Sequence, residues 1–130
     1  MTNRETAIYA LAGFSVWLSG AFTFRLGGKF LFENGPLVLV LSTIAIAATV
    51  CFVLRSAMGW RKAPSSQAVE VAVVMITPGL FGEVARLSMF GWATGLHLET
   101  AAPFAAVMIF STAVLLVYAV VVARTSPVVR

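Results

Sequence analysis

The chain has 130 residues, of which 60% are hydrophobic and 11% are charged, and its formal net charge is +4. Soluble domains carry about 25% charged residues, so this composition excludes an ordinary water-soluble domain. The apolar residues form uncharged blocks that reach the roughly 20 helical residues needed to cross a hydrocarbon core. Because these blocks lack barrel-type alternation, we predict an all-α integral membrane four-helix bundle, with residues 1–130 in a single membrane domain.

The first predicted span covers residues 7–31 and is uncharged as far as Phe24. A secretory signal peptide is the alternative for an apolar block near an N-terminus. This block is longer than the apolar region of such a peptide, and Arg25 follows it in place of a small-residue cleavage site. We therefore expect it to be retained as a span.

Three glycines on this span, Gly13, Gly20 and Gly27, are spaced by seven residues. They predict a stripe of small residues suited to close helix packing. The partner helix could belong to the same chain or to a second copy in a homodimer.

The other spans are predicted over residues 36–54, 67–92 and 101–123. The Asn34-Gly35-Pro36 turn separates the first two, since Asn-Gly favours a turn and proline suits the first helical turn. Basic residues concentrate on one side of four such crossings, which is the cytoplasmic side by the positive-inside rule. Both termini are therefore expected in the cytoplasm, together with Arg4, Arg55, Arg61, Lys62, Arg124 and Arg130.

Arg25, Glu83 and Arg86 are the charged residues that lie deepest in the predicted spans. The first and third spans run in the same direction, and at 1.5 Å per residue Arg25 and Glu83 lie at similar depths in the outer leaflet. Ionised groups there usually pair or face the bundle interior, so we predict a Glu83–Arg25 ion pair. Arg86 is one turn further on, where it could share Glu83 or extend outward.

This polar cluster has two interpretations. It could be a site for an anionic or zwitterionic solute or for a proton, with Thr77 contributing a hydroxyl. It could instead be a clamp that determines how the helices meet, and this second interpretation is favoured. Pro78 and Gly79 predict a helix kink just before the cluster, and the freed carbonyl near Val74 could line a cavity or merely mark a packing kink.

Several function classes lack their required residues. The single cysteine, Cys51, excludes a Cys-x-x-Cys redox pair, and the first span has no carboxylate of the kind that small multidrug exporters use. His97 is the only histidine and falls in a predicted loop, so no intramembrane haem ligand is present. His97 and Glu99 match no metal-ligand spacing. We expect no metal, no cofactor and no nucleic-acid partner.

Two stretches resemble an uncharacterised family of small bacterial four-span membrane proteins, a domain of unknown function. The first, residues 17–29, reads Trp-Leu-Ser-Gly-Ala-Phe-Thr-Phe-Arg-Leu-Gly-Gly-Lys, and the second, residues 77–83, reads Thr-Pro-Gly-Leu-Phe-Gly-Glu. The resemblance implies a four-helix fold in the bacterial inner membrane and associates Arg25, Pro78, Gly79 and Glu83. It implies no activity.

The sequence therefore favours a small polytopic inner-membrane protein that is structural or accessory and not enzymatic. The alternative is a small oligomeric transporter or channel that uses Arg25, Glu83 and Arg86. The lipid bilayer is the expected partner, and a homo-oligomer or a larger membrane complex is compatible with either function.

Overall fold

The computed structural model describes the backbone of residues 1–88 and 98–125; the side chains at 25, 28–29, 31–33, 87 and 98–104 are not described. The described chain forms α1 (Asn3–Glu33), α2 (Pro36–Arg61), the 3-10 turn η1 (Ser65–Gln67), α3 (Ala68–Ser88) and α4 (Leu98–Thr125). Each α-helix contributes a segment long and apolar enough to cross a membrane. The prediction of four packed, membrane-length helices is confirmed.

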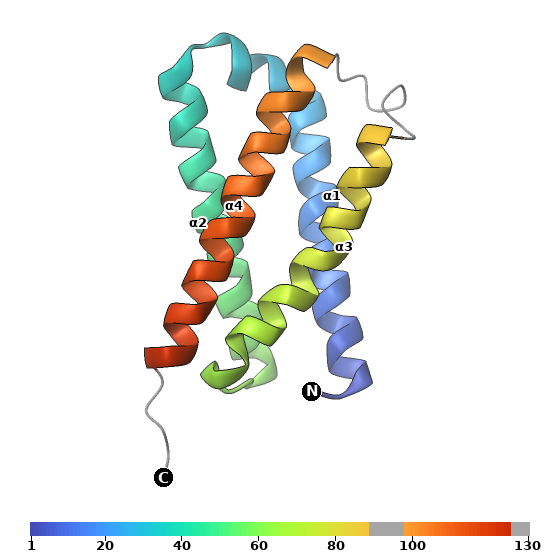
Figure 1. Cartoon of the computed structure of the whole chain (residues 1–130), viewed down its shortest axis with the longest axis vertical. Helices are drawn as coiled ribbons and strands as arrows, with labels where there is room; N and C mark the ends of the chain where they lie inside the picture. Colours follow the sequence, from blue (N-terminus) through green and yellow to red (C-terminus); the bar gives the residue numbers. More distant parts are fainter. Residues whose placement is uncertain (89–97, 126–130) are drawn as a thin grey trace.

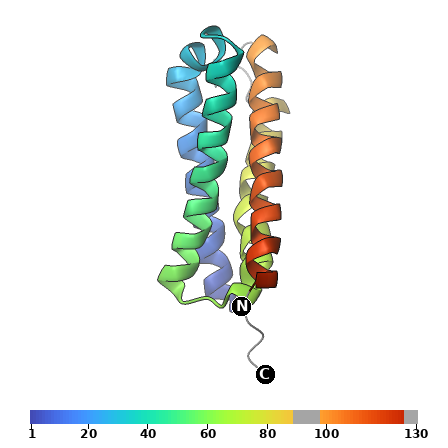
Figure 2. The ribbon, with the colours of Figure 1, turned by 90° about the vertical axis from the view of Figure 1, so that its left-hand side faces the viewer.

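The helices pack in two layers, with α1 and α2 in one layer and α3 and α4 in the other (Figures 1 and 2). The start of α1, the connection between α2 and α3, and the end of α4 lie at the same end of the bundle (Figure 1). We call this the terminal end. As predicted, α1 and α3 run in the same direction, so a residue on one helix can face a residue of similar depth on the other.

Local signals explain where the helices begin and end. Thr2 and Glu5 form a capping box at the start of α1, which satisfies backbone N–H groups of the first turn and lets the helix begin at Asn3. Gly35 precedes α2 with φ 95°, a backbone conformation that a side chain would oppose. Lys62 ends α2 in the left-handed conformation, and the N–H groups of this turn are bonded to the last helical carbonyls.

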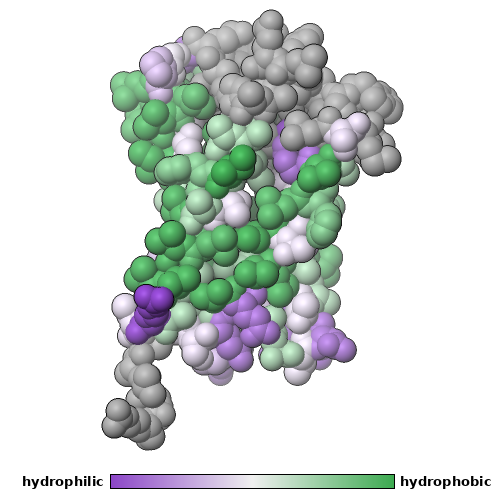
Figure 3. All heavy atoms as spheres, viewed as in Figure 1, coloured by the Kyte–Doolittle hydropathy of each residue, from purple (hydrophilic) through white to green (hydrophobic). Residues whose placement is uncertain are grey.

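Polar contacts link the helices at the terminal end. Helix α2 continues past Arg55 to Arg61, beyond the last residue of the predicted apolar span. The guanidinium of Arg55 donates to the Tyr118 hydroxyl at 3.5 Å, and Arg61 lies 3.8 Å from the Glu5 carboxylate. Figure 3 shows polar residues gathered at this end and mainly apolar residues over the middle of the described face above it.

The buried core lies in two parts. The larger cluster includes Tyr9, Leu54, Val71, Met75 and Leu115, so all four α-helices contribute to it. A smaller cluster, formed by Phe24 and Val107, lies further from the terminal end. Many large apolar residues are exposed instead of buried, as expected for helices that contact lipid.

Candidate functional site

Glu83 and Arg86 form a buried ion pair on α3. Their residues are 7% and 4% exposed, respectively. Arg86 Nε donates to Glu83 Oε2 at 3.2 Å, while Nη2 donates to Oε1, so the guanidinium contacts both carboxylate oxygens. This bidentate arrangement is the strong form of an arginine–carboxylate pair. Arg86 thus turns back onto Glu83 and does not extend outward.

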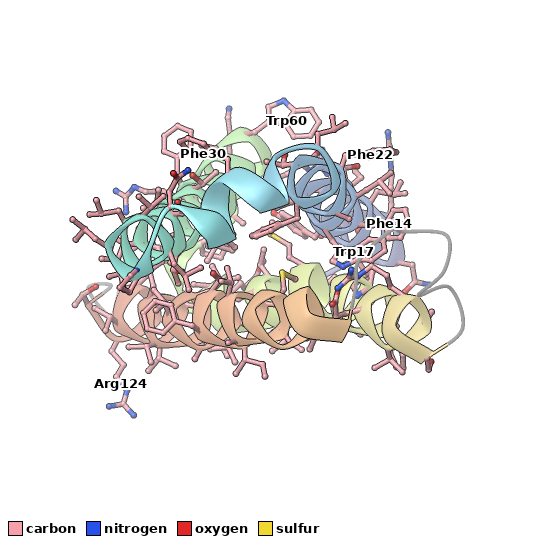
Figure 4. All side chains as sticks on the ribbon, turned by 90° about the horizontal axis from the view of Figure 1, so that it is seen from above. Phe14, Trp17, Phe22, Phe30, Trp60 and Arg124 are labelled. Atoms are coloured by element: carbon pink, nitrogen blue, oxygen red, sulfur yellow. The ribbon has the colours of Figure 1, made fainter. Side chains whose placement is uncertain are left out.

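Trp17 connects this ion pair to α1. Its indole Nε1 donates to Glu83 Oε2 at 3.2 Å, so that oxygen accepts from both Trp17 and Arg86. Figure 4 shows the Trp17 side chain extending from α1 towards α3. Since an indole N–H in an apolar span has no water to bond, Glu83 satisfies a donor that would otherwise be unpaired.

Glycines on α3 make room for the Trp17 ring. A Cβ on Gly82 would lie 2.9 Å from Trp17 Cη2, and a Cβ on Gly79 would lie 3.2 Å from Trp17 Cβ. Gly79, Gly82 and Glu83 lie on one face of α3, because residues three and four apart are neighbours on a helix. The two glycines form a surface against which the indole lies with its N–H directed at Glu83.

Gly13 permits an even closer approach one helical turn earlier. A Cβ at Gly13 would lie 1.8 Å from the carbonyl oxygen of Met75, so the backbones of α1 and α3 are in direct contact there. Close contact of this kind is the usual role of small residues between membrane helices. Gly13 against Met75 and Trp17 against Gly79 together set the register between the two helices.

The predicted pairing of Arg25 with Glu83 lies outside the described side chains. Arg25 belongs to α1. If the register of Gly13 with Met75 and of Trp17 with Gly79 continues along α1, the Arg25 backbone lies about one turn beyond Glu83. The Arg25–Glu83 contact remains a prediction, while Arg86 and Trp17 are the partners that the structure does describe.

Thr77 is not brought together with Glu83 and Arg86. It is exposed, and its hydroxyl donates to the Val73 carbonyl at 2.7 Å within α3. Pro78 lies inside α3 and cannot donate to the Val74 carbonyl. The first half of α3 is more inclined than its second half (Figure 1), which agrees with a bend at this position.

The glycines of the predicted stripe on α1 have different surroundings. Gly13 contacts α3, whereas a Cβ on Gly20 or Gly27 would meet no atom of the described residues within 4 Å. The three therefore do not form one contact surface within the described chain. Gly20 instead lines a cavity.

This cavity has a volume of about 440 Å³ and is lined by residues of all four α-helices. Met75 and Leu115 of the larger core cluster bound it on one side, and Phe24 of the smaller cluster bounds it on the other. Trp17 and Gly79 line it as well, whereas the lining does not include Glu83 or Arg86. The ion pair therefore lies behind Trp17 and not on the cavity wall.

Sequence reasoning missed two features of this region. Trp17 was not identified as a partner of Glu83, although it lies one turn after Gly13 and its N–H needs an acceptor in an apolar span. Ser111 is the second feature. It is 4% exposed, it lines the cavity, and its hydroxyl has no hydrogen-bond partner among the described residues. A single serine in an apolar span carries no signal that distinguishes it from a packing residue.

Within the described residues, no group of three histidine, cysteine or acidic side chains could hold a metal ion. His97 and the side chains of Glu33 and Glu99 lie outside that part of the chain. Cys51 is a partly buried free thiol within α2. The described chemistry of the site is thus one ion pair, one indole N–H and several hydroxyl groups.

No curated protein sequence and no solved structure matches the chain. A family model does match it, over residues 30–126. The match contains the Thr77–Glu83 stretch and the ion pair on α3, whereas Gly13 and Trp17 precede it. Because the match covers most of the chain, the protein belongs to DUF5367, a family of unknown function.

Proposed function

We propose that this protein is a non-enzymatic, multi-pass membrane protein that acts as a structural or accessory component. In this proposal the cluster of Trp17, Glu83 and Arg86 is a clamp that holds α1 against α3. The observation that carries the proposal is the hydrogen bonding of Glu83: both of its carboxylate oxygens accept hydrogen bonds, and the residue is 7% exposed.

A solute or proton site needs a group that the solute can reach. Glu83 and Arg86 lie outside the cavity lining, and Trp17 covers them on the α1 side. Removing two charges from water is unfavourable unless each is well paired, and the bidentate contact provides that pairing. A closed, paired cluster supports an architectural role better than a transport role.

The clamp proposal includes the orientation of the bundle. The terminal end carries exposed basic residues and the cross-helix contacts of Arg55 and Arg61. The positive-inside rule places such an end in the cytoplasm, so we place both termini there, in a bacterial inner membrane. Cysteine-accessibility labelling of single-cysteine variants, at Ser66 on the terminal end and at Asn34 on the opposite end, would test this orientation.

The substitution Glu83→Gln separates the clamp from a transport site. It removes the negative charge that the Arg86 guanidinium contacts, so we expect a loss of about 3 kcal/mol in the free energy of unfolding in detergent. Thr77→Val is a matched control on α3, because Thr77 is exposed and bonds only within its own helix. Proton and solute flux would be measured in parallel in proteoliposomes.

If the cluster is a clamp, Glu83→Gln should markedly lower the free energy of unfolding, and no proton or solute flux should depend on Glu83. If Glu83→Gln left the stability unchanged and abolished a flux present in the unsubstituted protein, the architectural role would be wrong. The oligomeric transporter that uses Arg25, Glu83 and Arg86 would then be the function.

A further inference from the structure

Arg55 is a cation near the terminal end of α2 that has no acidic partner among the described residues. The described ion pairs belong to Arg61 and Arg86. The Arg55 guanidinium contacts the Tyr118 hydroxyl instead, at 3.5 Å, which is longer than the usual hydrogen bond of about 2.7–3.2 Å. Since a guanidinium carries five N–H donors, most of the donors of Arg55 are available to another group.

The position of Arg55 along α2 places it beside the lipid headgroups. It lies roughly 28 Å from Pro36, at about 1.5 Å per residue, and a hydrocarbon core is about 30 Å thick. A span that enters the core at Pro36 therefore brings Arg55 to the opposite edge, whereas Arg61 lies roughly 9 Å further out. Arg55 is exposed, so a molecule in the surrounding membrane can reach its guanidinium.

The surface of α2 differs on the two sides of Arg55. Gly59, one turn nearer the terminal end, is exposed, and a Cβ there would meet no described atom within 4 Å. Space beside Arg55 is therefore open on the side of the headgroups. Phe52, one turn deeper in the span, is 71% exposed and presents an apolar ring on the side of the acyl chains.

Tyr118 on α4 adds a second donor at the same place. Its hydroxyl oxygen accepts from Arg55, so its own proton points elsewhere, and no described residue accepts that proton. A guanidinium and a phenolic hydroxyl from neighbouring helices can thus donate to one shared group. Phosphate suits them, because it offers several acceptor oxygens and a negative charge, and arginine binds it bidentately.

The charge of the terminal end favours an anionic lipid over a zwitterionic one. The described basic residues there outnumber the acidic ones: Arg4, Arg55, Arg61, Lys62 and Arg124 against Glu5 and Glu70. A zwitterionic headgroup brings a cation along with its phosphate, whereas an anionic headgroup brings a net negative charge to an end with excess positive charge.

We propose that Arg55 and Tyr118 bind the phosphate of one anionic phospholipid. Both side chains donate to phosphate oxygens, the headgroup lies over Gly59, and an acyl chain lies along Phe52. The bound lipid connects α2 to α4 at the membrane surface. This binding goes beyond the structural role of the Glu83 clamp, and it depends neither on that clamp nor on which side of the membrane the terminal end faces.

Native mass spectrometry of the full chain released from detergent micelles tests the proposal by counting the lipids bound to each molecule. The probes are phosphatidylglycerol and phosphatidylcholine of equal acyl-chain length, which share the phosphodiester and differ in net charge. We expect one phosphatidylglycerol to bind saturably and about five-fold more tightly than phosphatidylcholine. Equal binding of the two lipids would overturn the proposal. This comparison uses the unsubstituted chain, so it stands even if a variant fails to fold.

Substitutions locate the site. Arg55→Gln should weaken phosphatidylglycerol binding about ten-fold, and Tyr118→Phe, which removes only the hydroxyl, should weaken it about three-fold. Arg55→Lys keeps the charge and should restore part of the loss. Arg124→Gln is the matched control, because it removes one positive charge at the same end from a side chain that extends away from the bundle (Figure 4). Equal losses from Arg124→Gln and Arg55→Gln would show attraction by the whole end and refute the assigned site.

The double variant tests whether both side chains contact the same phosphate. If they do, Arg55→Gln with Tyr118→Phe should lose less affinity than the product of the two single losses. Fully independent losses would contradict a shared phosphate.

Free phosphate has the same chemistry as the headgroup. Inorganic phosphate at millimolar concentration should leave phosphatidylglycerol bound, because it lacks the acyl chains that contact the apolar surface. Displacement of the lipid by inorganic phosphate would assign the site to a soluble anion and overturn the lipid as its occupant.

Discussion

Substitution of Gly13 by alanine tests the close contact between α1 and α3. The new Cβ would lie 1.8 Å from the Met75 carbonyl oxygen, whereas ordinary contact begins at 3.4 Å. The contacted oxygen belongs to the backbone, which cannot rotate away as a side chain can. The helices must therefore separate by about 1.6 Å at this point. Overpacking of this kind typically costs about 1–3 kcal/mol.

The same separation would affect the clamp one turn away. Trp17 Nε1 and Glu83 Oε2 are 3.2 Å apart, so a displacement of that size would take them beyond hydrogen-bond distance. Loss of the hydrogen bond would add to the overpacking. We therefore expect Gly13→Ala to lower the free energy of unfolding by about 2–3 kcal/mol and to change the fluorescence of Trp17.

Unfolding of the purified protein in mixed micelles, followed by circular dichroism as the denaturing detergent increases, measures this effect. Gly20→Ala is the control, because it makes the same change on the same helix where a Cβ meets nothing within 4 Å. Both variants gain the same helix propensity, so their difference isolates the contact. If Gly13→Ala proved as stable as Gly20→Ala, the direct backbone contact would be wrong.

Three further predictions concern the clamp and the start of α1. Trp17→Phe removes the indole donor and should lower stability by about 1 kcal/mol; unchanged unfolding would show that the Trp17–Glu83 bond contributes nothing. Replacing Glu83 and Arg86 together by leucine should preserve more stability than Glu83→Gln alone, because no uncompensated charge remains; the opposite order in unfolding experiments would contradict this. Thr2→Ala removes the cap and should speed amide hydrogen exchange of Glu5 without changing the core, at a cost of about 1 kcal/mol in the first turn.

The four membrane-length helices could be predicted because they depend on local properties of the chain. An uncharged block of sufficient length must form a helix in lipid whatever its neighbours are. The common direction of α1 and α3 followed from the number of crossings. The burial of Glu83 was also predictable in kind, since charged groups within a span avoid lipid, whereas the sequence left open whether Arg86 shares Glu83 or extends outward.

The partners of Glu83 were harder to predict. Depth along the helix indicated Arg25 as a partner, and depth alone does not specify which face of each helix meets the other. The described partners are Arg86 on the same helix and Trp17 on α1. Likewise, the regular spacing of Gly13, Gly20 and Gly27 could not show that, among the described atoms, a Cβ would meet α3 at Gly13 and not at the other two.

The amino-acid sequence by itself determined that this protein is a bundle of four membrane-length helices, because hydropathy and span length act within each segment. Only the tertiary structure decided what the polar groups do. The contact of Gly13 with Met75 sets the register that brings the Trp17 indole to Glu83. The packing of all four α-helices leaves a cavity that Met75 and Leu115 of one core cluster and Phe24 of the other line. Both features depend on the distances between helices, which no single segment encodes.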